Sequence, residues 1–388
     1  MLEKVKLVNF KSHKSTELNL DSSRLHALVG QNSSGKTSVL QAIHYLSMLT
    51  NSDFTNVFQN ERSPEFLTTI GQDNMSVIGS GFWGDYNREN WEASYKWIKT
   101  LKDWSPTVLG KSHRDIKDSS QDIKDIIIMG RPPRLKSLRD AASPITESLR
   151  YAVHLKLVAS DLTKAAYSDA IEPRLDFDSS LLAPTLDYIR AEAPDKFQAL
   201  QEMLQRIVPG VKKIGVRRAK VPVNRQRSIE VDGKSIFYEE SQEMIGQEVV
   251  LDMNTGERIP SHAISEGTML TLGLLTVLMN PKQPNLVLLD DIEQGLHPKA
   301  QRDLMTVFKE IIQANPNLQI IFSTHSPYIV DELTPSQVHV LSNTKSGFTR
   351  SKRLDEHPDV EWAKQTLTTG EFWDAEGEDW VVEGEIND

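Results

Sequence analysis

The stretch Gly30-Gln31-Asn32-Ser33-Ser34-Gly35-Lys36-Thr37 decides the fold, because it matches G-x-x-x-x-G-K-[ST] at every fixed position. The largely apolar run Leu25–Val29 precedes it and predicts a buried parallel strand. After it, Val39, Leu40, Ile43, Leu46 and Leu49 recur at helical spacing and predict a helix with one apolar face. A strand, a glycine-rich turn and a helix in this order indicate a phosphate-binding loop (P-loop).

The chemistry of this loop follows from its glycines. They let the backbone curl so that its N–H groups face phosphate oxygens, at the positive end of the following helix. Lys36 is expected to reach the β- and γ-phosphates and Thr37 to ligate Mg²⁺, so ATP and Mg²⁺ are the expected cofactors. The alternative is a Gly/Ser-rich turn that binds nothing, but the complete motif in its proper context favours a nucleotide site.

A second apolar run, Leu286–Leu289, ends in the acids Asp290 and Asp291. A buried strand that delivers a carboxylate to its C-terminal edge suits the Mg²⁺-holding acid of a P-loop protein, the Walker B acid. We expect Asp290 to hold the metal through water and Asp291 to orient the attacking water. Ordinary strand termination is the alternative, and the P-loop upstream argues against it.

The rest of the chain predicts an α/β fold with a mixed, mainly parallel sheet, an antiparallel β subdomain and a helical insertion. Four of the seven tryptophans (Trp83, Trp91, Trp97, Trp104) lie within 76–104, where alternation predicts antiparallel strands. These rings are expected to pack the sheet, with base stacking as the alternative. The predicted segments are a first ATPase lobe at 1–105, the insertion at 106–205, a second lobe at 206–370 and an acidic tail at 371–388.

Two further stretches are Ile264-Ser265-Glu266-Gly267-Thr268 and Phe322-Ser323-Thr324-His325-Ser326, on either side of Asp290 in the chain. Their order and spacing resemble the ATP-binding-cassette (ABC) type of ATPase, in the branch that includes RecF, SMC-like and OLD-family proteins. The opening Val8-Asn9-Phe10-Lys11-Ser12 resembles the same branch. The matched segments cover about residues 1–50 and 260–335, and no motif covers the middle of the chain.

The resemblance implies roles for several residues. Ser265, Glu266, Gly267 and Thr268 match the signature motif, which contacts the γ-phosphate of ATP held by a partner subunit. His325 matches the switch histidine, and Asp290 to Pro298 matches the Walker B and D-loop run. The residues expected to contact ATP in the same chain are Lys11, Ser12, Gly30, Gln31, Asn32, Ser33, Ser34, Gly35, Lys36, Thr37 and Ser38. A signature that must reach a second ATP implies a head-to-tail dimer.

Asp291 departs from the family pattern, which usually has Glu at this position. Aspartate keeps the carboxylate but shortens its reach by one methylene, and errors near 1 Å can cost about 10²-fold in rate. We therefore expect ATP binding with slow hydrolysis. Lys36, Asp291 and His325 are the expected catalytic residues.

Nucleic acid is a further expected ligand. Lys212, Lys213, Arg217, Arg218, Lys220, Arg225 and Arg227 place seven cations in a stretch without an acid. Such a stripe could neutralise phosphates, or it could be the solvated face of a strand pair. The formal charge of −10 does not oppose DNA binding, because residues 371–388 hold eight acids and no Lys or Arg. The rest of the chain is nearly neutral.

The composition excludes several classes of protein. With no cysteine there is no disulfide, iron–sulfur cluster or cysteine nucleophile, which suits a reducing compartment. No long apolar run or signal-peptide pattern is present, so we expect a cytoplasmic protein without membrane contact. The end of the chain, from Trp380 to Gly384, resembles the start of a TOPRIM nuclease domain, but the later acids of its metal site are missing. We expect Trp373 and Trp380 to dock instead, on a partner or on the chain's own ATPase core.

The implied function is an ATPase that acts as sensor or scaffold for a separately encoded effector, a nuclease or toxin, as in two-gene anti-phage systems. One alternative is a RecF-like DNA-repair ATPase acting on ends or gaps. Another is a nucleotide-gated assembly protein without significant turnover. The expected partners are a second copy of the chain, an effector protein and DNA.

Overall fold

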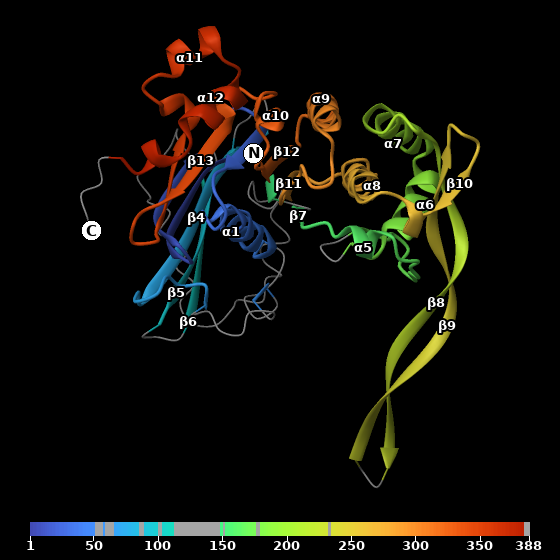
Figure 1. Cartoon of the computed structure of the whole chain (residues 1–388). Coiled ribbons are helices and arrows are strands. Elements are labelled where there is room, and N and C mark those ends of the chain that lie inside the picture. Colours follow the sequence, from blue (N-terminus) through green and yellow to red (C-terminus); the bar gives the residue numbers. More distant parts are fainter. Residues whose placement is uncertain are drawn as a thin grey trace. The chain divides into compact units, whose positions relative to one another are not determined.

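The computed structural model forms two compact units, which are described one at a time (Figure 1). Unit 1 comprises Met1–Leu155, Pro284–Glu293 and Met305–Asp388, and unit 2 comprises Lys156–Gln283 and Gln294–Leu304. Within these ranges the structure describes residues 1–50, 57–58, 66–84, 89–99, 103–111, 148–149, 152–175, 179–231 and 234–383.

Unit 1 contains a six-stranded sheet whose order is β14-β13-β3-β12-β11-β7. Its strands are β3 (Leu25–Val29), β7 (Val153–Leu155), β11 (Leu286–Leu289), β12 (Gln319–Ser323), β13 (Val338–Asn343) and β14 (Thr349–Arg353). All neighbours pair in parallel except β13 and β14, which confirms the mainly parallel sheet. Because β3, β11 and β12 are parallel neighbours, the loops at their carboxyl ends meet at one edge.

The second sheet of unit 1 is antiparallel, in the order β2-β1-β4-β5-β6. Its strands are β1 (Leu2–Phe10), β2 (His13–Asn19), β4 (Asn74–Trp83), β5 (Glu89–Ile98) and β6 (Asp103–Lys111). Trp91 is 2% exposed and Trp97 is 7% exposed, so these two rings pack the sheet and are not free to stack on bases. The Trp104 side chain lies outside the described residues.

Helix α1 (Lys36–Met48) lies between the two sheets of unit 1. Val39, Leu40 and Ile43 are at most 1% exposed and join one apolar cluster with residues of both sheets. The helix is apolar on more than one side because each of the two sheets covers one side of it, as expected for a helix inside a core. This packing fixes the first turn of α1, which follows the P-loop directly.

The C-terminal part of unit 1 folds back on its own core. Its helices are α10 (Pro327–Val330), η4 (Pro335–Gln337), η5 (Leu354–Glu356), α11 (Val360–Thr366), α12 (Thr369–Glu376) and η6 (Asp379–Val381). The preceding helix, α9 (Pro298–Ala314), has residues in both units. Trp373 and Trp380 are 6% and 8% exposed. Lys352 Nζ donates to the Trp380 carbonyl at 3.1 Å and lies 5.5 Å from its ring centroid. The predicted docking of both tryptophans is therefore on the chain's own core.

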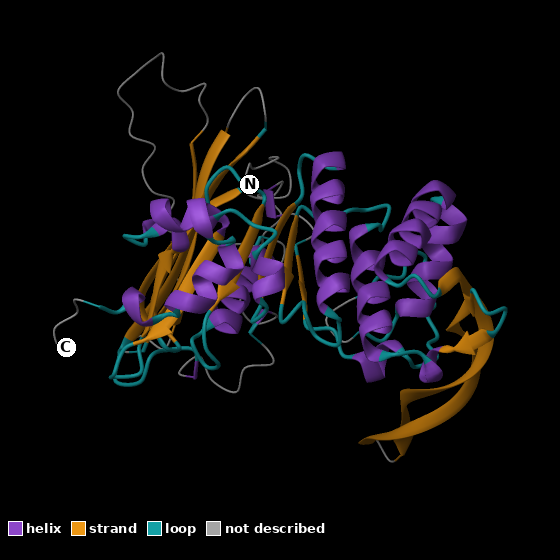
Figure 2. Cartoon of the chain, turned by 45° about the horizontal axis from the view of Figure 1, so that its top comes forward, coloured by secondary structure: helices purple, strands orange, loops and turns teal. Residues whose placement is uncertain are grey.

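Unit 2 is a small helical body with a long β-ribbon (Figure 2). Its helices are α5 (Ala159–Leu162), α6 (Leu182–Glu192), α7 (Pro194–Ile207), η3 (Ser261–Ala263) and α8 (Glu266–Leu278). The ribbon pairs β8 (Val211–Val231) with β9 (Lys234–Met253), and β10 (Arg258–Pro260) adds a short third strand at the base. Its far half extends away from the helices as two strands alone (Figure 1).

The predicted segment boundaries stay a prediction, although some elements cross them. β6 runs through the predicted boundary at residue 105, and β7 within the predicted insertion joins the parallel sheet. The described end of the insertion is helical, in α5, α6 and α7. Residues 112–147 of the predicted insertion lie outside the described residues.

Buried histidines make the stability of unit 1 sensitive to acid. Burial lowers the pKa of His13 and His44 to about 4, and it lowers the pKa of His26 and His339 as well. Because an unfolded imidazole titrates near pH 6.5, unfolding takes up protons below that pH. The stabilisation is complete above about pH 6.5 and is lost as the pH falls towards 4, by about 1 kcal/mol for His13 at pH 5.5.

We therefore expect the melting temperature to fall between pH 7 and pH 5, measured by differential scanning calorimetry. His339 lies on β13, where its ring packs against His26, and it serves for the test. His339→Gln should flatten the pH dependence, because glutamine does not titrate. An unchanged slope in this variant would contradict the assignment.

Candidate nucleotide site

The P-loop has the backbone of an anion-binding turn. Gly30 and Gly35 have φ of 141° and 93°, and Ser33 has φ of 65°, all in the left-handed region. A Cβ on Gly30 would lie 2.2 Å from the carbonyl oxygen of Leu341, so only glycine fits there. Gly35 caps the N-terminus of α1, whose free N–H groups and positive dipole attract phosphate.

Lys36 is buried in the loop, and its Nζ donates to the carbonyls of Gly30 and Gln31, each at 2.9 Å. Burial lowers the pKa of Lys36, and the carboxylates of Asp291 and Asp290 oppose that shift. The amine therefore points back into the loop at the place where a phosphate would sit. Glu378 in the C-terminal segment adds a weaker effect of the same sign as the two aspartates.

Asp290 lies at the end of β11 beside the P-loop. The Thr37 hydroxyl donates to its two carboxylate oxygens at 3.1 and 2.8 Å. Ser323, at the end of β12, donates to Asp290 Oδ1 at 2.5 Å. Neighbouring parallel strands thus bring together the two residues predicted to hold Mg²⁺, and they add a serine that the sequence did not single out.

Asp291 is exposed and has φ of 51°, in the left-handed region. Its N–H donates to Ser323 Oγ at 2.9 Å, which fixes the backbone at this point. Aspartate and asparagine tolerate left-handed geometry better than most side chains. The local backbone therefore gives a physical reason for a short acid at this position.

Glu293 holds the switch segment. Its carboxylate accepts hydrogen bonds from Thr324 Oγ1 and from the N–H of His325, both at 2.7 Å. The imidazole of His325 is exposed, at the same sheet edge as Asp290 and Asp291. Glu293 is thus bound to Thr324 and to the backbone of His325, and these bonds were not foreseen from the sequence.

The signature stretch lies in unit 2, at the start of α8. Ser265 and Glu266 are exposed, and Ser265 Oγ lies 2.8 Å from Thr268 Oγ1. Gly267 is buried against the D-loop, where an added Cβ would lie 2.1 Å from the carbonyl oxygen of Gly295. The two motifs are therefore in direct backbone contact within unit 2, and contact with a partner's ATP stays a prediction.

The predicted contacts of Lys11 and Ser12 with ATP also stay a prediction. Lys11 Nζ donates to Gln41 Oε1 on α1, and Ser12 Oγ lies 2.7 Å from Thr349 Oγ1 on β14. Both side chains therefore form hydrogen bonds to other side chains of the protein. The remaining P-loop side chains Gln31, Asn32 and Ser33 are exposed, and Ser38 is half-buried.

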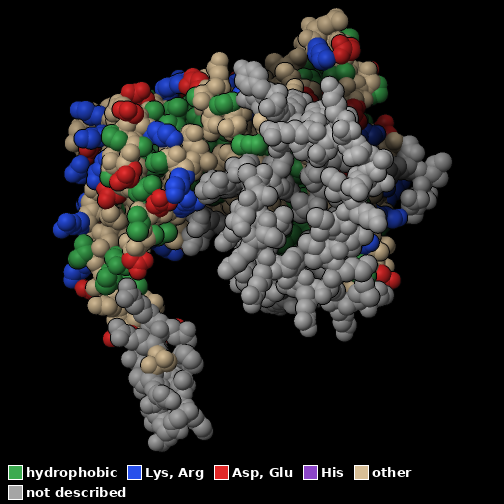
Figure 3. Space-filling view, turned by 180° about the vertical axis from the view of Figure 1, so that it is seen from behind, with side chains coloured by type: hydrophobic (Ala, Val, Ile, Leu, Met, Phe, Trp, Pro, Cys, Tyr) green, Lys and Arg blue, Asp and Glu red, His purple; other side chains and the backbone are tan. Residues whose placement is uncertain are grey.

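The cationic stripe lies on β8, and its described side chains are exposed. The paired strand β9 supplies acids that the stripe itself lacks: Glu248 for Arg217, Glu243 for Lys220, and Asp252 near Lys212 and Lys213. Side chains of both signs are interspersed on the described surface of unit 2 (Figure 3). The side chains of Arg225 and Arg227 lie outside the described residues.

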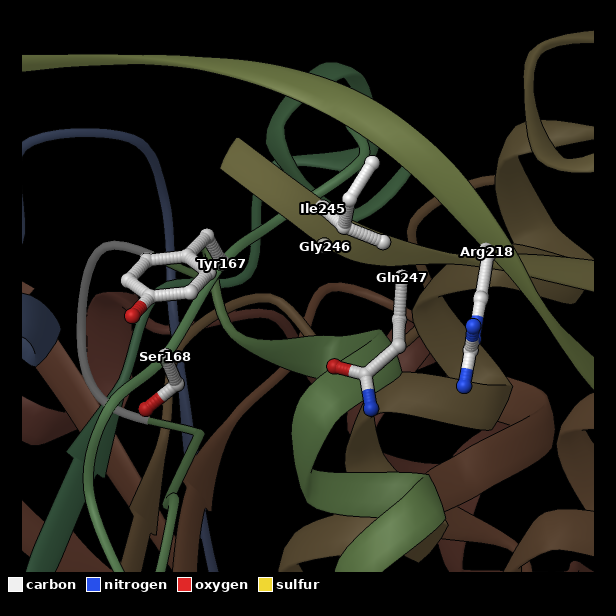
Figure 4. A pocket seen from close by; sticks show the side chains of 6 residues that line it. All are labelled: Tyr167, Ser168, Arg218, Ile245, Gly246 and Gln247. Carbon is white, nitrogen blue, oxygen red and sulfur yellow. The ribbon is translucent and has the colours of Figure 1, made fainter. Parts of the chain in front are cut away.

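Arg218 differs from Arg217 and Lys220, because it lies opposite Gln247 on β9 and no acid among the described residues pairs with it. It faces an open hollow of about 390 Å³ at the base of the ribbon (Figure 4). The hollow is lined by Tyr167, Ser168, Arg218, Ile245, Gly246 and Gln247. Among the described cations of the stripe, Arg217 and Lys220 are thus ion-paired and Arg218 is not.

The residues at the sheet edge fit a Mg²⁺–nucleotide. The Thr37 hydroxyl and the Asp290 carboxylate are oxygen donors, which Mg²⁺ prefers. Ser34 Oγ is buried with no hydrogen-bond partner among the described residues.

Comparison with known proteins agrees with this geometry. Residues 25–331 match the family described as "AAA domain, putative AbiEii toxin, Type IV TA system". The chain belongs to this family. Its fold is that of an ABC-type P-loop ATPase, similar to SMC heads, as the motifs predicted.

Among curated proteins, this chain is similar to the "Retron Vc95 probable ATPase" of Vibrio cholerae serotype O1 biovar El Tor, with 28% identity over 135 residues. The match covers 31% of this chain and 26% of the relative, so the chain matches about a quarter of the relative's length. The family and this relative connect the chain to ATPases of retron and toxin–antitoxin systems.

Solved structures agree on the fold. An SMC head bound to the C-winged helix domain of ScpA has a TM-score of 0.57 at 15% identity, over 92% of this chain and 98% of that one. The SMC head with an extended coiled coil derived from Pyrococcus furiosus has a TM-score of 0.54 at 13% identity, over 94% and 99%. In the described part of the chain, no helix combines the length and apolarity that a membrane crossing needs.

Proposed function

We propose that this protein binds and hydrolyses ATP and uses the resulting conformational change to control a separate effector in anti-phage defence. The observation that carries the proposal is the bond between the Thr37 hydroxyl and the Asp290 carboxylate at 2.8 Å, beside the P-loop. An oxygen pair of this kind beside the loop would suit Mg²⁺ bound to the phosphates, which supports the proposal. The retron relative and the toxin–antitoxin family support the defence role.

Each residue has a distinct task in this proposal. The N–H groups of the P-loop and the amine of Lys36 bind the phosphates, and Thr37 and Asp290 hold the metal. Mg²⁺ bound there would neutralise charge on the β- and γ-phosphates. Asp291 accepts a hydrogen bond from the attacking water and orients it, and His325 donates to an oxygen of the γ-phosphate. Glu293 and Ser323 hold these groups through the bonds described above.

The exposed signature residues Ser265 and Glu266 supply the second half of the site in a partner molecule. ATP then joins two copies head to tail, and hydrolysis releases them, so that nucleotide biases two states. The SMC-head fold supports this arrangement. A nuclease or toxin bound to one of the two states would be switched by ATP.

Mass measurement in solution tests the proposal. With Mg-ATP, the slow variant Asp291→Asn should shift to a dimer or larger assembly. Lys36→Ala should have the same mass with Mg-ATP as without nucleotide. Light scattering with and without ATP gives both masses. No ATP-dependent change in mass or shape for Asp291→Asn would contradict the sandwich.

A DNA-repair role is the second candidate, and Arg218 is the observation that favours it. Its unpaired charge faces a hollow that also holds the Tyr167 ring and the Gln247 amide (Figure 4). Arg218→Gln should weaken duplex DNA binding and reduce the slope of log K against log salt by about 1. Lys220→Gln, whose cation is paired with Glu243, is the matched control and should change binding less.

Fluorescence anisotropy with labelled duplex from 50 to 200 mM salt measures both variants. No binding at 50 mM, or affinity that does not depend on salt, would remove the DNA candidate. DNA-stimulated ATP turnover would favour it over the effector role. A stable assembly indifferent to hydrolysis would favour the third function, a nucleotide-gated assembly protein.

A further inference from the structure

The underside of the P-loop is held by side chains from outside the motif. His13 Nε2 lies 3.1 Å from the carbonyl oxygen of Gly35, and Asn343 Nδ2 donates to the carbonyl oxygen of Ser33 at 3.1 Å. His13 is fully buried, at 0% exposure. Because a carbonyl only accepts hydrogen bonds, the imidazole must carry its proton on Nε2.

These two contacts belong to one network. Thr349 Oγ1 donates to Asn343 Oδ1 at 3.2 Å, and the Thr349 carbonyl accepts from Thr16 Oγ1 at 3.1 Å. Thr16 Oγ1 in turn lies 3.0 Å from His13 Nδ1, so its single hydroxyl proton is shared between that nitrogen and the Thr349 carbonyl. We call His13, Thr16, Asn343 and Thr349 the P-loop cradle. It connects the β1–β2 hairpin to the β13–β14 hairpin beneath the loop.

The cradle acts on the parts of the loop that are costly to form. Ser33, at φ of 65°, is a non-glycine residue in the left-handed region, which is unfavourable for a residue with a Cβ. Gly35 lies directly on the cradle, since an added Cβ would be 2.6 Å from His13 Nε2 and 2.9 Å from Thr349 Oγ1. A loop whose N–H groups face a phosphate must point carbonyls away from it, and the cradle binds two of those carbonyls.

We propose that His13 and Asn343 are positioning residues that hold the P-loop in its anion-binding conformation before nucleotide arrives. This inference rests on the proposed ATP binding and deepens it. Neither side chain bonds to a residue expected to do chemistry, so losing one disorders the loop and weakens nucleotide binding in ground state and transition state alike. Such a loss raises KM with little change in kcat.

The test uses the full chain and a fluorescent ATP analogue with Mg²⁺. His13→Leu removes the donor and keeps similar bulk, and its Kd for the analogue should rise about 10-fold, as for the loss of about one net hydrogen bond. His13→Gln retains an amide donor and should recover most of that loss. Asn343→Leu should also raise the Kd. In the double variant the Kd should rise by less than the product of the two single-variant fold-changes.

His339→Leu is the matched control, because His339 is also buried in unit 1 and its ring packs against His26, with 5.5 Å between the ring centroids. Turnover measurements should show KM rising in His13→Leu with kcat within about 3-fold. The proposal is overturned if folded His13→Leu and Asn343→Leu bind the analogue like the wild type. It is also overturned if His339→Leu weakens binding equally, since general loss of packing would then explain the effect. Failure of the wild type to bind would instead refute the proposed ATPase function, and this inference with it.

Discussion

Asp291→Asn should lower ATP turnover by about 100-fold or more and leave nucleotide affinity nearly unchanged. The amide keeps the size of the side chain but cannot accept a proton or hold water as a carboxylate does, and such losses commonly cost about 10²–10³-fold. Asparagine also tolerates the backbone φ of 51° at this position, so the fold is preserved. Phosphate release under saturating ATP measures the turnover, and a fluorescent ATP analogue measures the affinity.

Glu17→Gln is the control for this prediction, because Glu17 is an exposed acid of unit 1 on β2 and forms an ion pair with Lys4. It should hydrolyse ATP at the wild-type rate. If Asp291→Asn also keeps that rate, Asp291 does not orient the water, and the role must pass to another group at this sheet edge.

Gly267→Ala should also reduce turnover by about 100-fold, for a different reason. Its new Cβ would lie 2.1 Å from the carbonyl oxygen of Gly295, so the signature and the D-loop must separate. A displacement near 1 Å at a reacting site costs about 10²-fold. The phosphate-binding residues lie in unit 1, so ATP affinity of the isolated chain should change little.

Gly210→Ala provides the comparison within unit 2, because its Cβ would meet only the flexible end of Met253, at 3.3 Å. It should keep turnover and ATP-dependent assembly. Circular dichroism establishes that α8 remains folded in both variants. A Gly267→Ala protein with normal turnover and assembly would show that the close contact between the two motifs is dispensable.

The sequence predicted the groups of the site that occupy fixed motif positions. Gly30 to Thr37 could be recognised because the phosphate-binding backbone needs glycine, lysine and a hydroxyl at set spacings. Asp290 could be recognised because it ends an apolar strand. In both cases local chemistry and local periodicity carry the information, and the parallel sheet then brings the pieces to one edge.

The groups that hold those pieces could not be predicted in the same way. Asn343 bonds to Ser33 across 310 positions of the chain, and no motif marks Asn343. Ser323 and Glu293 lay within recognised stretches, but their bonds depend on strand register. The pairing of the β9 acids with Arg217 and Lys220 could not be predicted either. Which side chains face each other across the ribbon depends on the register of the hairpin and not on composition.

The ribbon of unit 2 can be considered as a lever. Strand β9 has 20 residues, and at about 3.3 Å per residue a ribbon of this length spans about 65 Å. A rotation of about 10° at its base would therefore carry its tip about 11 Å, more than enough for an optical distance measurement. The sequence contains no cysteine, so a single introduced thiol near the tip would be the only labelling site on the chain. Small changes at the signature end of unit 2 would thus become large, measurable displacements at the far end of the ribbon.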